Sequence, residues 1–367
     1  MKKIVIVSSG RSHLLFLASE LSKQGHTVQF FSYINHAMAK RYGLPDGTLR
    51  SLTWLAAPLL FLVRKIPLPR IIRLCITWSV DVLIDIAASF LLPPCDVLIG
   101  HSCVALHASR KAKKKFNAKI ICDVGTVHVS DFDKISPHFP MTTRRILKYY
   151  DLADKIVVPS EHALKTFREH EISPLKLEKN CYGVDLSMFS PTELSPKAFD
   201  VIMVGRWSHA KGADILTEAA RRLNLRVLHV GPLSGLDFPR EENFVHVEPV
   251  PQSELPRFYA KAKICILPSQ IEGLSMVLLQ AAACGLPIVY SPMTGGNDVK
   301  KLTGTTVFMT EIRTLTVDVL CEAIIKNLSH AQNVPLVHKK RDYLGKSRSQ
   351  ISWNAYGSRY SKFIESI

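Results

Sequence analysis

The sequence is short of acidic side chains, with 31 Asp and Glu against 47 Lys and Arg in 367 residues. The formal net charge of +16 implies an acidic partner such as nucleic acid, an anionic membrane or a phosphorylated ligand. Recognised nucleic-acid-binding modules are missing, and no aromatic residues are interleaved with the basic run at 110–115. We therefore expect no nucleic-acid partner, and this run is either a solvated helix face or a surface attracted to anionic lipid headgroups.

Cysteine spacing of the kind that marks metal sites or disulfide frameworks is also absent. The eight cysteines lie without a CxxC pair or a Cys/His cluster, so the sequence indicates neither a zinc site nor a disulfide framework. We expect most of them to be buried thiols in a reducing compartment. No convincing D-x-D motif is present, because Asp131 and Asp133 have the spacing but fall in a predicted loop. The sequence accordingly predicts no metal and no cofactor.

Long hydrophobic runs are absent as well. No segment reaches the roughly 20 uninterrupted apolar residues that a spanning helix needs, and the apolar run at the N-terminus is too short for a secretory signal. We therefore expect a cytoplasmic protein. Residues 49–92 interleave apolar side chains with Arg and Lys, which is typical of an interfacial membrane segment and equally of two ordinary core helices. The first alternative places the protein on the inner face of the cytoplasmic membrane.

The order of the predicted elements indicates an α/β fold. Residues 2–32 have the pattern of a strand, a turn, a helix and a strand, which is typical of a Rossmann-like unit, although the full G-x-G-x-x-G fingerprint is missing. A second series of this kind follows a polar, proline-containing linker that ends near Ala198. We predict an N-terminal domain at 1–197, a C-terminal domain at 198–349 and a terminal helix at 350–367 that packs back on the N-terminal domain.

The most informative stretch of the sequence is 268–296. It follows a short apolar run at 264–267, which we predict to be a buried parallel strand, and Glu272 lies in the turn after that strand. In open α/β sheets, ligands bind at the carboxyl ends of the strands, where helix N-termini present free N–H groups to anions. We expect Glu272 to accept hydrogen bonds from sugar hydroxyls there. Gln280 lies two helical turns later on roughly the same face.

A second loop, at 205–212, carries positive charge. It combines Arg206, whose planar fork suits a pyrophosphate, with Lys211, which supplies a point charge. A predicted helix N-terminus follows the loop and adds to its affinity for anions. The loop alone is more typical of a surface turn with two solvated cations, but its place about sixty residues before Glu272 favours a binding function.

Together these segments resemble the retaining, GT-B-fold glycosyltransferases of family 4. The stretch that begins at Glu272 resembles the family's E-x7-E donor signature, with Gln280 in place of the second Glu, and the 205–212 loop resembles its G-R-x5-K-G-type loop. The resemblance implies that Glu272 contacts the donor sugar and Gln280 the nucleotide ribose. It implies that Arg206 and Lys211 neutralise the departing diphosphate. The fold that it implies has two Rossmann-like, doubly wound domains that face a central cleft.

The resemblance also implies a wider set of site residues. The implied donor-binding set is Gly10, Gly205, Arg206, Lys211, Val250, Glu272, Gly273, Leu274, Ser275, Gln280, Gly295 and Gly296, with backbone N–H groups of Leu274 and Ser275 donating to the phosphates. The implied catalytic set is His128, Arg206, Lys211 and Glu272. His128 takes the place of the family's acceptor-side histidine because the stretch from Asp123 resembles a D/E-R-G-S-x-H variant, with Val124 in place of Arg. We expect His128 to lie at a strand end facing the cleft, with His13 and His101 as its rivals.

The activity that the resemblance implies is a retaining, metal-independent transfer. A sugar would pass from a nucleotide-diphosphate sugar to a glycan or lipid-linked acceptor in cell-surface polysaccharide or lipopolysaccharide biosynthesis. The acceptor hydroxyl attacks from the side on which the diphosphate leaves, and the leaving phosphate oxygen takes the proton. Two alternatives remain: a binding subunit of a transferase complex with little or no turnover, which Gln280 favours, and a nucleotide-sugar epimerase.

Overall fold

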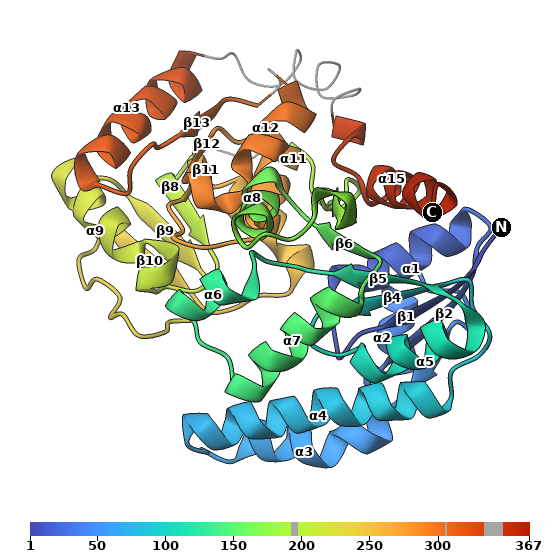
Figure 1. Ribbon diagram of the computed structural model, residues 1–367. Coiled ribbons are helices and arrows are strands. Elements are labelled where there is room, and N and C mark those ends of the chain that lie inside the picture. Colours follow the sequence, from blue (N-terminus) through green and yellow to red (C-terminus); the bar gives the residue numbers. More distant parts are fainter. Residues whose placement is uncertain (192–196, 305–306, 334–347) are drawn as a thin grey trace. The chain divides into compact units, whose positions relative to one another are not determined.

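The computed structural model describes residues 1–191, 197–304, 307–333 and 348–367 (Figure 1). By its internal contacts the chain divides into two units. Unit 1 comprises Met1–Pro159, Leu164–Asn180 and Tyr356–Ile367, and unit 2 comprises Ser160–Ala163 and Cys181–Ala355. Each unit is built around one sheet whose paired strands run parallel.

Unit 1 contains a seven-stranded sheet in the order β3-β2-β1-β4-β5-β6-β7. Apolar side chains occupy consecutive buried positions in its central strands, as expected for a parallel sheet that is covered on both faces. These strands therefore lack the alternation of apolar and polar residues that is typical of a sheet with one exposed face. The strands are β1 (Lys3–Val7), β2 (Thr27–Ser32), β3 (Leu49–Ser51), β4 (Val97–His101), β5 (Lys119–Asp123), β6 (Lys155–Val158) and β7 (Leu177–Lys179).

Helices connect these strands. Helices α3 and α4 pack side by side as a hairpin, and α4 packs in turn on α5 (Figure 1). Helix α4 also contacts β2 of the sheet, so its inner face is buried and the outer face of the hairpin is not. The helices are α1 (His13–Lys23), α2 (His36–Arg41), α3 (Thr53–Lys65), α4 (Arg70–Phe90), α5 (Leu106–Phe116), α6 (Val129–Ile135), α7 (Pro140–Leu152), α8 (Glu161–Glu169) and the C-terminal α15 (Trp353–Glu365).

Unit 2 contains a six-stranded sheet in the order β10-β9-β8-β11-β12-β13. Helices α9 and α13 pack together, and their apolar faces join the strand side chains in one buried core that also holds Trp207. The strands are β8 (Phe199–Val204), β9 (Val227–Val230), β10 (Phe244–Val247), β11 (Ala262–Leu267), β12 (Ile288–Tyr290) and β13 (Met309–Glu311). The helices are α9 (Ala213–Arg222), α10 (Leu255–Tyr259), α11 (Met276–Ala283), α12 (Gly296–Thr303) and α13 (Val317–Asn333).

The division between the units differs from the predicted boundary after residue 197. Residues from Cys181 onward belong to unit 2 because the backbone at Val184 pairs with the chain near its C-terminal end: Val184 N donates to Ile351 O at 2.8 Å. Arg348 also donates to Leu186 O, at 2.8 Å. The predicted linker before Ala198 lies partly outside the described residues, as does most of 334–349 in the predicted second domain.

The C-terminal helix α15 returns to unit 1 from Tyr356 onward. Ser361 Oγ lies 2.8 Å from His26 Nε2, and Tyr360 OH donates to Asp123 Oδ2 at 3.0 Å. A Cβ at Gly357 would overlap the Glu20 side chain, so the glycine lets α15 approach α1 closely. The helix therefore contributes a hydroxyl to the carboxyl end of β5 in unit 1.

Candidate active site

The sheet of unit 2 has a topological switch point between β8 and β11. The chain passes from β8 outward through β9 to β10 and then returns to the other side of β8 with β11. Ligands of doubly wound sheets bind at such a reversal, outside the carboxyl ends of the two neighbouring strands. The loop after β8 carries Arg206 and Lys211, and the turn after β11 carries Glu272, so the fold brings the predicted charges to one edge.

Two contacts hold these loops together. Gln270 N donates to Ala210 O at 2.9 Å. Gly212 has φ of +71°, and a Cβ there would overlap the Pro268 carbonyl, so only glycine lets the two loops pack this closely. The consequence is a direct ion pair between Lys211 Nζ and Glu272 Oε1. Ser269 Oγ donates to the same carboxylate oxygen at 3.2 Å.

Arg206 and Trp207 are neighbours in sequence with opposite exposure. Trp207 is fully buried, and its backbone N donates to Pro232 O at 2.9 Å, which fixes the loop on the sheet. Arg206 is exposed and pairs with no carboxylate of the described residues. The buried indole thus holds an uncommitted guanidinium fork at the switch point, where a diphosphate would accept two parallel hydrogen bonds from it.

Gly295 and Gly296 bring the next turn against the one that carries Glu272. Gly295 has φ of +72°, and a Cβ there would meet the Leu274 and Ser160 side chains, while a Cβ on Gly296 would overlap the Tyr290 ring. Gly273 lies between these turns, and its carbonyl accepts a hydrogen bond from Ser160 Oγ at 2.5 Å.

The 274–275 segment corrects one detail of the predicted site. Ser275 N donates to Thr294 O at 3.1 Å, so this N–H, which the sequence assigned to phosphate binding, already has a protein acceptor. Leu274 is buried beside it. A hydrogen bond and packing within unit 2 therefore fix the shape of this turn.

Gln280 is 5% exposed, and its carboxamide oxygen accepts a hydrogen bond from Tyr259 OH at 2.9 Å. Tyr259 comes from α10, and burial raises its pKa well above the ordinary tyrosine value, so the hydroxyl remains a donor. The predicted ribose contact would have to share an amide that this tyrosine already engages. Val250, the remaining predicted donor residue of unit 2, lies half-buried three residues past β10.

His229 is a positioning residue that the sequence patterns did not indicate. It is fully buried in β9, and its Nε2 lies 2.8 Å from the carbonyl of Gly205, the residue before Arg206. Burial lowers the pKa of His229 to about 4, so the ring is neutral near pH 7. The signal that points to it is one polar residue inside an otherwise apolar strand, two positions before Gly231. A Cβ on Gly231 would overlap the Gly205 carbonyl. The backbone at Gly231 therefore also lies in close contact with the start of the 205–212 loop.

Unit 1 has its own switch point, between β1 and β4. Gly10 is buried in the turn after β1, where a Cβ would collide with the Tyr33 hydroxyl. His13 follows at the start of α1, and its Nε2 lies 2.5 Å from Asp123 Oδ1. His101 is paired in register with Asp123 on the next strand, and desolvation lowers the pKa of His101 to about 4. His13 thus contacts the Asp123 carboxylate, whereas His101 lies on the neighbouring strand with its Nδ1 3.2 Å from Cys103 Sγ.

His128 lies elsewhere in unit 1. It is the N-cap of α6, its Nδ1 accepts from Ser130 N at 3.3 Å, and its ring stacks on His170 with centroids 4.0 Å apart. The side chain is 3% exposed, and burial lowers its pKa to about 4. The sequence predicted His128 at a strand end facing the cleft, whereas its side chain packs inside unit 1 against Tyr150 and Phe167. Its catalytic role stays a prediction.

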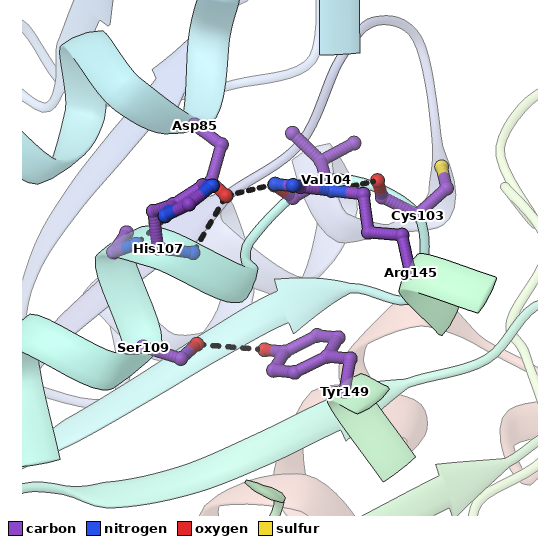
Figure 2. A network of polar contacts seen from close by, with 8 residues as sticks. Asp85, Cys103, Val104, His107, Ser109, Arg145 and Tyr149 are labelled. Atoms are coloured by element: carbon purple, nitrogen blue, oxygen red, sulfur yellow. Dashed lines mark hydrogen bonds and ion pairs between the residues drawn. The ribbon is translucent and has the colours of Figure 1, made fainter. Parts of the chain in front are cut away.

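A buried ion pair supports the turn after β4 (Figure 2). Asp85 of α4 accepts from His107 N at 2.6 Å and Ala108 N at 2.8 Å, at the start of α5, and pairs with Arg145 of α7. Arg145 also donates to the carbonyls of Cys103 at 3.2 Å and Val104 at 2.9 Å. The Arg145 side chain therefore ties α4 and α7 to the turn that follows His101.

Two further properties concern what the described residues lack. No three His, Cys, Asp or Glu side chains in the described ranges gather in a way that would hold a metal ion. Within the same ranges, no helix has both the length and the apolar content needed to cross a bilayer.

Comparison with known proteins assigns each unit to the same group of enzymes. A family model described as Glycosyltransferase Family 4 matches residues 11–188, and one described as Glycosyl transferases group 1 matches residues 198–330. A protein named D-inositol 3-phosphate glycosyltransferase from Mycolicibacterium gilvum is 30% identical over 184 residues, which are 44% of this chain and 42% of the relative. A protein of the same name from Streptosporangium roseum is 25% identical over 237 residues, 54% of each. The chain thus spans about half, or less, of the curated relatives that it matches.

Solved structures share the whole architecture. Sucrose-phosphate synthase from Thermosynechococcus elongatus superposes with a TM-score of 0.69 at 14% identity, covering 100% of this chain and 99% of that one. An Anabaena protein in complex with UDP-glucose gives a TM-score of 0.65 at 13% identity and covers 100% of both chains. At these identities the likeness shows the fold, which confirms the predicted GT-B type with two parallel Rossmann-like sheets. The chain belongs to the family 4, group 1 glycosyltransferases.

Proposed function

We propose that the chain is a retaining glycosyltransferase that takes a sugar from a nucleotide-diphosphate sugar. The observation that carries this proposal is the cluster at the β8–β11 switch point, where Lys211 pairs with Glu272 beside the exposed Arg206. One carboxylate and two cations at a helix-flanked sheet edge match the hydroxyls and the diphosphate of such a donor. The name of the Anabaena structure, which includes UDP-glucose, supports a uridine nucleotide as the first one to test.

The transfer that we propose uses the protein for positioning and charge stabilisation. Glu272 accepts hydrogen bonds from donor sugar hydroxyls, while Lys211 and Arg206 neutralise the charge that develops on the departing diphosphate. The acceptor hydroxyl attacks on the face that the diphosphate leaves, the new glycosidic bond forms as the sugar–phosphate bond breaks, and a leaving phosphate oxygen takes the proton. No carboxylate nucleophile and no metal enters this scheme.

The proposed acceptor is a glycan or lipid-linked sugar used in cell-surface polysaccharide or lipopolysaccharide synthesis, at the inner face of the cytoplasmic membrane. The net charge of +16 supports an anionic acceptor or surface. The relatives' names favour a second class, phosphorylated small polyols or sugars, because they specify inositol 3-phosphate. Both classes carry phosphate, so a test must offer each of them.

A donor screen tests the proposal. Calorimetry with a panel of nucleotide sugars identifies the donor, and product analysis after incubation with lipid-linked sugars or with inositol and hexose phosphates identifies the acceptor. We expect micromolar-range donor binding, slow donor hydrolysis and transfer with retained anomeric configuration, in the absence of added metal and with chelator present. Binding without hydrolysis or transfer would instead support a binding subunit, and an epimerised sugar from donor alone would support an epimerase.

A further inference from the structure

The outward face of α3 is apolar, contrary to the usual pattern for a surface helix. Its exposed positions recur at three- and four-residue intervals, so they form one stripe. Trp54 is 72% exposed and Phe61 is 60% exposed on this stripe, with Leu62 and Lys65 beside them. The opposite side, which includes the buried Ala56, packs inward. Large exposed side chains gathered in this way mark a surface that contacts something other than water.

Helix α4 repeats the arrangement. Ile72, Leu83, Ile86 and Phe90 lie on one face by helical spacing, and all four are exposed, Phe90 at 79%. Because α3 and α4 lie side by side, their apolar stripes belong to a single hairpin (Figure 1). Helix α4 has 21 residues, so the surface extends for roughly 30 Å along its axis.

The exposed charged side chains described on the hairpin are all basic. No Asp or Glu occurs from residue 47 to residue 80, whereas that stretch contains five basic residues, Arg50, Arg64, Lys65, Arg70 and Arg73. Arg50, Lys65, Arg70 and Arg73 are exposed. The two carboxylates of α4, Asp81 and Asp85, are buried on its opposite face, where Asp85 pairs with Arg145 (Figure 2).

Helix α5 continues the positive charge past the end of α4. Its Arg110 and Lys114 are exposed, Lys113 pairs with Asp154 at 2.7 Å, and Lys111 Nζ lies 5.9 Å from the centre of the exposed Phe90 ring. The basic run at 110–115 therefore borders the apolar stripe and does not stand on an unrelated face. Aromatic and aliphatic side chains rimmed by Arg and Lys are the composition of interfacial helices.

We propose that the α3–α4 hairpin docks on an anionic lipid bilayer, with its apolar stripe in the headgroup region and the basic residues of α3, α4 and α5 against the lipid phosphates. A purely cationic rim complements an anionic surface, and long basic side chains reach phosphate while their stems cover apolar groups. The docking does not rest on sugar transfer, because it involves none of the residues at the switch points. A lipid-linked acceptor would reach the protein from the bilayer at this surface.

Vesicle co-sedimentation tests the proposal with the full chain and no donor. Vesicles of phosphatidylcholine with about one-third phosphatidylglycerol should retain the protein at least ~10-fold better than phosphatidylcholine alone, and raised salt should weaken the binding. The apolar double variant Phe61→Ser/Phe90→Ser and the charge double variant Arg70→Gln/Arg73→Gln should each reduce this binding by about 10-fold or more. Matched controls are Leu175→Ser, an 83% exposed leucine elsewhere in unit 1, and Arg313→Gln, an exposed arginine in unit 2.

Trp54 supplies a second measurement that does not depend on sedimentation. Trp207 and Trp353 are buried and Trp78 of α4 is half-buried, whereas Trp54 is 72% exposed, so added anionic vesicles should shift the wild-type emission to the blue and shift that of Trp54→Phe far less. Unchanged vesicle binding by the folded double variants would overturn the proposal. It would equally be overturned by absence of wild-type binding, by equal binding to neutral vesicles, or by self-association through this face in sedimentation analysis. Each of these results leaves the donor screen interpretable.

Discussion

The two switch points use opposite kinds of polar groups. In unit 2 the charges lie at or near the surface: Arg206 is exposed, and the Lys211 side chain in the Lys211–Glu272 pair is 29% exposed. In unit 1 the groups are largely enclosed, with His13 held on Asp123 and with a buried carboxylate–arginine pair under the turn after His101. The same sheet topology thus presents partly exposed charged groups in one unit and enclosed polar groups in the other.

This difference has an energetic consequence, because the free-energy cost of a charged group depends on how deeply it is buried. The Lys211 and Glu272 side chains keep 29% and 16% of their surface exposed, so exchanging this pair for a phosphate costs less free energy than breaking the Asp85–Arg145 pair, which is almost fully buried. Buried charges need every hydrogen bond to be made, which explains why Asp85 has two backbone donors in addition to Arg145. The polar groups at the unit 2 edge can therefore change partners at a lower cost in free energy than those at the unit 1 edge.

The largest effect that this comparison predicts is on stability in unit 1. Arg145→Ala leaves Asp85 buried without its cation and should lower the free energy of unfolding by about 3–5 kcal/mol, measured by urea denaturation. The control is Arg222→Ala in unit 2, whose exposed pair with Asp318 should contribute far less. Similar losses of unfolding free energy in Arg145→Ala and Arg222→Ala would contradict the expected difference between a buried and an exposed ion pair.

The next effect is on turnover and belongs to unit 2. Glu272→Gln removes the carboxylate that would hold the donor sugar, and kcat/KM for transfer should fall by about 10²–10³-fold while the protein stays folded. Glu242→Gln changes an exposed glutamate in the same unit and should leave turnover unchanged. Full activity in the Glu272 variant would mean that the donor binds elsewhere.

Gln280 is buried, unlike Arg206 and Lys211 of the same unit, so a substitution there is a separate test. Gln280→Glu places a carboxylate at a 5% exposed position whose main neighbour is the Tyr259 hydroxyl, and should cost about 1–3 kcal/mol of unfolding free energy. Nucleotide binding, measured by calorimetry, should be kept or tightened if the side chain also reaches the ribose. An unchanged unfolding curve would show that the 280 side chain is more open to water than the structure places it.

The last effect is a pH dependence in unit 1, which is small at each pH step and is spread over a wide pH window. Burial raises the pKa of Asp81 from 3.8 to about 7, against hydrogen bonds from Ser9 and Cys103 and the charge of Arg145, which lower it. Folded Asp81 therefore binds a proton between these pH values and the unfolded chain does not, so its stabilising contribution is complete below pH 3.8 and is lost as the pH rises through about 7.

Asp81→Asn removes this proton. The difference in unfolding free energy between wild type and variant should therefore change by about 1 kcal/mol per pH unit inside the window and stay constant above it. Urea denaturation at several pH values measures it. A difference that does not vary with pH would show that Asp81 remains ionised when folded.

The sequence predicted those parts of the site that local patterns encode. The apolar run before Glu272 and the glycines that flank Arg206 and Lys211 are short-range signals, and parallel strands must carry their ends to one edge. Sequence spacing therefore sufficed to place the charges of unit 2 at one edge. The hairpin at 49–92 was predicted as two helical pieces, but the short strand β3 at its start was not.

The remaining contacts join residues that no local pattern connects. Arg145 reaches Asp85 from 60 positions away, and Tyr259 reaches Gln280 from another helix. His128 stacks on His170, which directly follows the end of α8. Such pairings arise from how helices pack on a finished sheet, so the residues that tune these sites emerge only from the tertiary structure.

The contact between His229 and Gly205 has a consequence for where protons reside. A carbonyl oxygen only accepts, so His229 must carry its hydrogen on Nε2, and its Nδ1 is left as a bare lone pair. That nitrogen lies 2.9 Å from His246 Nδ1, which must then be the protonated one. The backbone oxygen thereby fixes the hydrogen positions where the two rings meet, and because His246 Nε2 also lies 3.3 Å from Glu248 Oε1, nitrogen NMR of the histidine rings would show whether His246 carries one hydrogen or two.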